Sequence, residues 1–259
     1  MPKQGLSQLA TGKEGTLRIT VLNGGSVCVV FMVLAMSLDP IRGFAEYSLG
    51  KVSGGYTVAE RVTQYGQTVE ARLRLQIEAA GLAYPPHDVT YVDFKDSRRL
   101  EVYGRMFDDQ SWRLIAEYPI LAESGTLGPK LKDGDEQVPE GIYRAESLNP
   151  NSRFHLSIRV NYPNEFDRRM AQADGRTQLG GDIMIHGNSV SIGCLAMGDQ
   201  AAEDLFILAA LATKERVRIV ISPTDFRMAG PMQVPNQPAW VGSLYDALRA
   251  ELQQYRKIM

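Results

Sequence analysis

The sequence predicts an α+β fold in which a mainly β body is flanked by helices. Three observations support this fold class. An amphipathic helical pattern comes first, several short segments with period-two alternation follow, and the last part of the chain mixes strands with helices. Because 44% of the 259 residues are hydrophobic, the chain can bury a sizeable core.

The elements follow in a clear order. Apolar residues recur at three- and four-residue spacing over residues 58–80, which predicts a helix that Gly81 ends. Period-two alternation then predicts three strands of an antiparallel meander, at residues 89–94, 99–105 and 112–120. Further strands are predicted at residues 141–147, 154–160, 182–186 and 217–222. We expect helices at residues 201–213, with Asp199 as N-cap, and at residues 240–256.

One long connection stands out between the meander and the later strands. Residues 123–140 (ESGTLGPKLKDGDEQVPE) are rich in Gly, Pro and charge, which predicts an exposed loop. A loop of this length in a compact domain often has a function.

The N-terminus carries a charge-free apolar run at residues 27–38, preceded by Lys3, Lys13 and Arg18. A basic leader before a short apolar core is typical of a signal peptide, and small residues favour cleavage after Ala45. The run is shorter than the roughly 20 residues of a spanning helix. We therefore expect an exported protein, with a retained N-terminal membrane anchor as the alternative.

Composition excludes several classes. Two cysteines, Cys28 and Cys194, exclude a multi-disulfide scaffold and a Cys-rich metal site, and three histidines leave little material for a His-built metal centre. The near balance of 28 basic and 30 acidic residues argues against nucleic-acid binding. Removal of the leader takes Cys28 with it, so Cys194 would be a single thiol in an oxidising compartment and a candidate reactive residue.

The residues around Cys194 favour a catalytic role for its thiol. A predicted strand ends at His186, Gly187 lets the chain turn, and Gly193 precedes Cys194. An imidazole can take the proton of a thiol and return it to a leaving amine, because the thiolate is the reactive form. Backbone N–H groups at Gly193 and Cys194 are candidate oxyanion donors, and Ser191 can orient the loop. Alternatively, His186 ends an ordinary strand and Cys194 packs in the core.

The segment HGNSVSIGCLAM resembles the active-site signature of L,D-transpeptidases of the YkuD type, and more closely their YafK-like branch. The resemblance extends over roughly residues 82–227, through the motifs TYVDFKDSRRLEV, SGTLGPK, PEGIY, NPNSRF and NYPNEFDR. Most YkuD-type enzymes have Ser-His-Gly-Cys followed two residues later by Arg, whereas Ile192 and Ala196 occupy those two positions here. The YafK-like branch shares the SIGC form, which leaves His186 as the imidazole nearest the nucleophile in sequence.

The resemblance implies a periplasmic enzyme of Gram-negative bacteria that acts on peptidoglycan stem peptides without a metal or other cofactor. Cys194 would form a thioester with a tetrapeptide stem, His186 would be the base, and the loop 123–140 would form part of the acceptor cleft. The implied organisation is a signal peptide or anchor at residues 1–45, a helical segment at 46–83, the catalytic domain at 84–227 and a C-terminal helical extension at 228–259.

Other functions stay open at this point. A hydrolytic relative would cleave a stem–peptide bond, or the bond between the stem and a cell-wall-anchored lipoprotein, with the same residues. A non-catalytic cell-wall-binding module would keep only the fold. A papain-like peptidase fits less well, because its cysteine precedes its histidine.

Several charged residues are weaker candidates. Lys130, Lys132 and Arg153 can meet the carboxylates of a stem peptide, and Lys130 and Arg153 are our substrate-binding candidates. His87 follows a Pro-Pro loop and His155 lies in an alternating strand, so we expect both to be structural.

Overall fold

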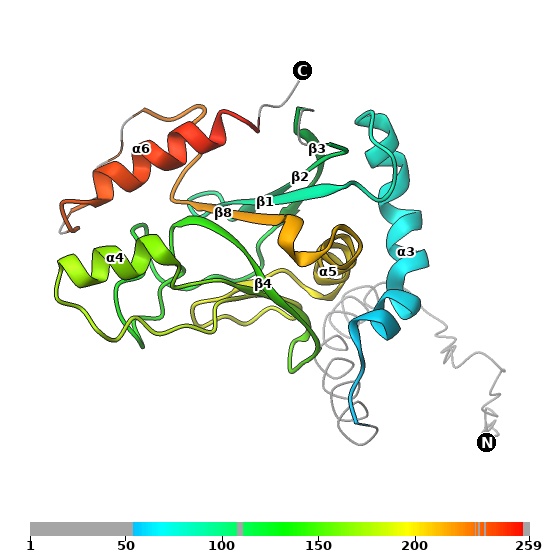
Figure 1. Cartoon of the computed structure of the whole chain (residues 1–259), viewed down its shortest axis with the longest axis horizontal. Coiled ribbons are helices and arrows are strands. Elements are labelled where there is room, and N and C mark those ends of the chain that lie inside the picture. The colour runs from blue at the N-terminus through cyan, green and yellow to red at the C-terminus, as the bar shows by residue number, and fades with distance from the viewer. Residues whose placement is uncertain (1–53, 108–110, 231, 233, 236, 256–259) are drawn as a thin grey trace, which may run out of the picture. The chain divides into compact units, whose positions relative to one another are not determined.

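The computed structural model describes residues 54–107, 111–230, 232, 234–235 and 237–255 (Figure 1). The predicted signal peptide or anchor at residues 1–45 lies outside them. Within the described residues, eight strands form one mixed sheet in the order β3-β2-β1-β8-β4-β5-β6-β7. None of the described helices combines the length and apolar character that a bilayer-spanning helix requires. The predicted α+β class is confirmed.

The first half of the sheet is the predicted antiparallel meander. Strands β1 (Asp88–Phe94), β2 (Arg99–Arg105) and β3 (Arg113–Pro119) pair in sequence order. Strand β8 (Val217–Ser222) then pairs with β1 in parallel. All seven residues of β1 are buried, because this strand is covered on both faces.

The second half of the sheet extends from β8 to the motif around Cys194. Strand β4 (Gly141–Ser152) pairs with β8 and is longer than predicted, and β5 (His155–Val160) pairs back on it. Strand β6 (Met184–His186) pairs with β5. The two-residue strand β7 (Leu195–Ala196), which periodicity did not predict, pairs with β6 in parallel.

Two hydrophobic cores lie on opposite faces of the sheet, as the alternation along β1 requires. Val89 and Tyr91 pack in the larger core with the helices α3 (Val58–Ala79) and α5 (Asp199–Ala212). Val92 and Phe94 pack in the smaller core with the closing helix α6 (Val241–Leu252). Figure 1 shows α3 and α5 next to each other, with α6 across the sheet.

Helix α3 begins and docks through polar contacts that its sequence supplies. The hydroxyl of Thr57 accepts a hydrogen bond from the backbone of Glu60, whose carboxylate accepts one from the backbone of Thr57, forming a capping box. Arg72 then donates to Glu203 and Asp204 of α5. These ion pairs fix how the helix lies against its neighbour.

One local expectation was wrong, and one helix was not predicted. Gly198, and not Asp199, occupies the N-cap position of α5; the Asp199 carboxylate instead accepts a hydrogen bond from the backbone of Asn188. The helix α4 (Glu165–Ala173) was not predicted, although Asn164 and Asp167 form a capping box at its start. The helix is short and buries little apolar surface, so its periodicity was weak.

The loop 123–140 contains no regular helix or strand, as predicted, but it is not simply exposed. Gly128, Lys130 and residues 137–140 are buried. The buried ammonium group of Lys95 donates to the carbonyls of Gly128 and Val138 and to the carboxylate of Glu140, each at 3.0 Å. One cation directly after β1 thus holds two separated parts of the loop.

We expect Glu140→Ala to lower the free energy of unfolding by about 3–5 kcal/mol, because it leaves the buried Lys95 ammonium group without its counter-charge. Thermal or urea unfolding monitored by circular dichroism would measure this. The matched control is Glu136→Ala, an exposed carboxylate of the same loop, for which we expect a change within about 0.5 kcal/mol. Equal stability of the two variants would show that the Lys95–Glu140 pair does not hold the loop.

Candidate active site

The parallel pair of β6 and β7 places His186 and Cys194 on one face of the sheet. Ile185 pairs with Leu195 and His186 with Ala196, so continuing the register by one residue sets Cys194 beside Met184. Partners in neighbouring strands point to the same face, and residues two apart along a strand do so as well. Ile185 and Leu195 face the larger core, which leaves His186 and Cys194 on the opposite face.

The register also bounds the distance between the two residues. Two residues along a strand span about 6.6 Å and neighbouring strands lie about 4.8 Å apart, which together give about 8 Å between the Cα atoms. An imidazole and a thiol that extend from the same face can meet across that gap. Within the described residues, no hydrogen bond joins the two side chains; the thiol instead faces the carbonyl of Asp182 at 3.5 Å.

His186 is held as a neutral base. Its ring is buried and stacks on Phe154, with ring centroids 4.7 Å apart. Nδ1 lies 2.5 Å from the carbonyl oxygen of Gly187, which can only accept, so Nδ1 carries the proton and Nε2 has the free lone pair. Burial lowers the pKa of His186, and the hydrogen bond to Gly187 acts against this. The imidazole is therefore ready to take a proton at neutral pH.

Cys194 is held as a thiol. Burial is the main cause that raises its pKa, and the negative charge of Asp182 raises it further, while a backbone hydrogen bond from Met184 acts in the opposite direction. A neutral imidazole near a protonated thiol differs from a preformed thiolate–imidazolium pair. In this arrangement, deprotonation of the nucleophile has to accompany attack.

The backbone before the nucleophile is tightly specified. Gly193 has φ +98°, a conformation that favours glycine, and its N–H donates to the hydroxyl of Ser124 at 2.5 Å. The Cys194 N–H donates to the hydroxyl of Ser191 at 3.0 Å, and this hydroxyl donates to the Cys194 carbonyl. Ser191 thus joins the two ends of the turn before Cys194. The N–H groups of Gly193 and Cys194, which are the predicted oxyanion donors, already donate to serine hydroxyls. They can form an oxyanion hole only when a hydroxyl moves away.

Gly187 lies where the chain bends after β6, and close packing also requires a glycine there. A Cβ atom there would lie 2.5 Å from the carboxylate of Asp199 and 2.8 Å from the carbonyl of Phe154. The N–H of Gly187 donates to the Leu156 carbonyl. This glycine lets the chain after His186 pass against the start of α5.

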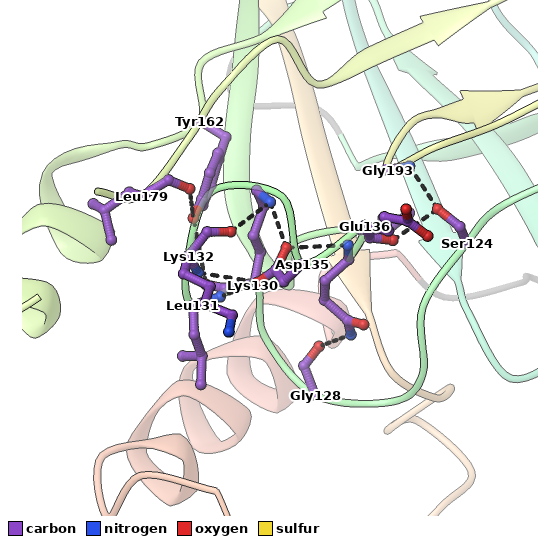
Figure 2. A network of polar contacts seen from close by, with 12 residues as sticks. Ser124, Gly128, Lys130, Leu131, Lys132, Asp135, Glu136, Tyr162, Leu179 and Gly193 are labelled. Atoms are coloured by element: carbon purple, nitrogen blue, oxygen red, sulfur yellow. Dashed lines mark hydrogen bonds and ion pairs between the residues drawn. The ribbon is translucent and has the colours of Figure 1, made fainter. Parts of the chain in front are cut away.

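The loop 123–140 braces the nucleophile segment. Just before it, Ala122 pairs with Ala196, so β7 is held between β6 and this bridge. Figure 2 shows how Ser124 connects two chain segments: its hydroxyl accepts from Gly193 and donates to the carbonyl of Glu136 at 2.7 Å. Asp135 organises the far part of the same network.

The two predicted substrate-binding residues lie in different settings. Lys130 is buried, and its ammonium group donates to Asp135 and to the carbonyl of Lys132, away from Gly193 (Figure 2). The ammonium group of Lys130 therefore makes contacts within the loop 123–140 in this structure. Arg153 is exposed in the turn between β4 and β5, beside Phe154, which stacks on His186.

Sequence reasoning missed Asp182 as a neighbour of the thiol and Arg159 as a residue of the same row of the sheet. Arg159 pairs with Met184 across β5 and β6, in the row that continues to Cys194. Its guanidinium lies 2.5 Å from the carboxylate of Asp182. Ser157 and Arg159 alternate with apolar residues, which indicates that they share a face of their strand. The alternation does not indicate which strand lies beside them.

The two remaining histidines occupy peripheral or structural positions. Nε2 of His155 lies 3.1 Å from Glu203, and its ring packs edge-on against Tyr65. His87 contacts Asp88 and Arg216 at the start of β1. Within the described residues, no group of three or more His, Cys, Asp and Glu side chains is arranged to hold a metal ion.

The chain is similar to known proteins over this region. The L,D-transpeptidase catalytic domain family, YkuD, matches residues 89–221. The YafK protein of Escherichia coli K12, whose own assignment as an L,D-transpeptidase is provisional, is 34% identical over 179 residues. That match covers 68% of this chain and 62% of the relative, so the chain spans less than two thirds of its length.

Solved structures with a similar fold are more distant. The helical cell shape determining protein Pgp2 from Campylobacter jejuni is 16% identical, with a TM-score of 0.43 over 67% of this chain and 72% of that one. Bd1075 from Bdellovibrio bacteriovorus is 24% identical, with a TM-score of 0.38 over 65% and 55%. L,D-transpeptidase 1 from Mycobacterium tuberculosis is 15% identical, with a TM-score of 0.31 over 54% and 73%.

The protonation state of Cys194 can be measured by alkylation. We expect the rate of iodoacetamide modification at Cys194 to keep rising through neutral pH, because the thiolate reacts and burial raises the thiol pKa. Mass spectrometry would locate the adduct. Asp182→Asn removes a negative charge near the sulfur and should move the profile to lower pH. A rate that is already constant below pH 7 would instead indicate a preformed ion pair.

Proposed function

Because the chain belongs to the YkuD family of L,D-transpeptidase catalytic domains, we propose that it is a cysteine-dependent peptidoglycan L,D-transpeptidase acting on tetrapeptide stems. The observation that carries the proposal is the β6–β7 register, which puts a neutral imidazole and a thiol on one face about 8 Å apart at their Cα atoms. His186 is the general base and Cys194 the nucleophile.

The first step forms a thioester. Nε2 of His186 takes the thiol proton as the sulfur of Cys194 attacks the carbonyl carbon at the L-centre of an L-to-D peptide bond. A C–S bond forms and the C–N bond breaks, while the imidazolium returns the proton to the amine of the leaving D-alanine. Stabilisation of the oxyanion falls to the N–H groups of Gly193 and Cys194, once Ser124 or Ser191 releases one of them.

The second step transfers the acyl group to an acceptor. The amine of a second stem, or a lysine of an anchored lipoprotein, attacks the thioester, gives its proton to His186 and releases the thiolate, which is reprotonated. Attack by water would make the same site a hydrolase. The loop 123–140 is the candidate wall of the acceptor cleft, because it contacts the nucleophile segment through Ser124.

We also propose that the protein works in the periplasm. The apolar run at residues 27–38 behind basic residues supports export, by a cleaved signal peptide or a retained anchor. Peptidoglycan stems lie in that compartment. A single thiol after removal of the leader fits an oxidising environment, since a second nearby cysteine could trap Cys194 as a disulfide.

A carbapenem tests the nucleophile directly. We expect the mature protein to gain the mass of one carbapenem, with the adduct on Cys194, because the drug mimics the end of the stem and acylates a reactive thiol. Cys194→Ala should show no adduct, and His186→Ala should slow acylation by about 10²–10⁴-fold. An unmodified wild-type protein with an intact circular dichroism spectrum would contradict the proposal.

Purified tetrapeptide-stem muropeptides separate the possible outcomes. We expect release of D-alanine together with crosslinked dimers, because an amine acceptor is present at high concentration. D-alanine release with tripeptide stems but no dimers would assign the hydrolytic alternative. Binding to sacculi without any release would assign a non-catalytic module. Cys194→Ala is the control in each assay.

A further inference from the structure

Arg159 lies in the same row of the sheet as the nucleophile. It pairs with Met184 across β5 and β6, and Met184 lies beside Cys194 when the β6–β7 register is continued by one residue. Ile158, next to Arg159, packs in the larger core. Arg159 therefore projects from the opposite face, which it shares with His186 and Cys194.

Among the described residues, the carboxylates that pair with the guanidinium of Arg159 are both exposed. Its nitrogens lie 2.6 Å from Glu146 and 2.5 Å from Asp182. The side chains of these partners are 52% and 78% exposed, whereas that of Arg159 is 36% exposed. Ion pairs this exposed contribute little to stability, so another carboxylate can displace one of them at small cost.

Asp182 connects this arginine to the thiol. Its carbonyl faces the Cys194 sulfur at 3.5 Å, and its carboxylate pairs with Arg159. The residue has φ +56°, a strained backbone conformation for a side chain other than glycine. Asp182 thus contacts the nucleophile through its carbonyl and the cation through its carboxylate.

We propose that Arg159 is the specificity residue that binds a free carboxylate of the substrate beside the scissile bond, in exchange for Asp182. The inference rests on the proposed function. A planar guanidinium fits a carboxylate through two parallel hydrogen bonds, which fixes orientation as well as charge. Either the terminal D-alanine or the diaminopimelate side chain can supply that carboxylate in a tetrapeptide stem.

The test measures D-alanine or D-alaninamide release from three matched stems: unmodified, amidated at the terminal D-alanine, and amidated at the diaminopimelate side chain. We expect Arg159→Ala to lower kcat/KM for the unmodified stem by about 10- to 100-fold, as for a lost charge-assisted hydrogen bond. With the amidated stem that lacks the recognised carboxylate, wild type and Arg159→Ala should be alike. If wild type and Arg159→Ala have the same kcat/KM with one amidated stem, the carboxylate that is amidated in that stem is the one that Arg159 binds.

Three controls separate recognition from a fault in folding. Arg159→Lys keeps the charge and should recover part of the lost kcat/KM. Asp182→Asn removes the carboxylate that the substrate displaces from Arg159 and should raise kcat/KM for the unmodified stem. Arg113→Ala changes an arginine of β3, at the other edge of the sheet, and should leave kcat/KM unchanged.

The results distinguish this inference from the function on which it rests. An unchanged kcat/KM in Arg159→Ala, or the same loss with all three stems, would overturn the role of Arg159 while leaving the transpeptidase proposal intact. No D-alanine release by wild type from the unmodified stem would overturn the proposed function, and the role of Arg159 with it.

Discussion

The site depends on the pairing of a two-residue strand. β7 is too short to hold itself, so its position comes from β6 on one side and from the Ala122–Ala196 bridge on the other. The Met197 N–H donates to the His186 carbonyl, so the base and the nucleophile segment share a backbone hydrogen bond. A shift of this register by one residue would move Cys194 to the face of the core and separate it from His186.

The loop before β4 is the brace that keeps this pairing in place. Its interior is polar, and a loop with a polar interior is stable only when its buried groups have partners. Lys95 and Glu140 anchor it to the sheet, Asp135 accepts from the backbone of Leu131 and Lys132, and Ser124 joins it to Gly193. The loop therefore positions the nucleophile even if it also contacts an acceptor.

The protonation states around the thiol are those of a site at rest, before substrate binds. Burial keeps the imidazole neutral and the thiol protonated, and Asp182 opposes formation of a thiolate. Both candidate oxyanion N–H groups donate to serine hydroxyls. Each of these features would change in the presence of a substrate whose carboxylate takes Arg159 and whose carbonyl meets the backbone, so substrate binding and activation are coupled in the proposed mechanism.

The sequence by itself determined the α+β class and most strand positions, because periodicity is a local property. Residue chemistry, which is also local, made His186 and Cys194 the candidate site residues. It did not determine that β6 and β7 pair in parallel, that Lys130 is buried against Asp135, or that Arg159 lies in the row of Cys194. Even contacts between residues near in sequence, such as Lys130 and Asp135 five positions apart, depend on how the loop folds. Others join distant segments, as Ser124 and Gly193 do across 69 positions. An alternating pattern says which side chains share a face, but only the folded sheet decides which strand lies beside it.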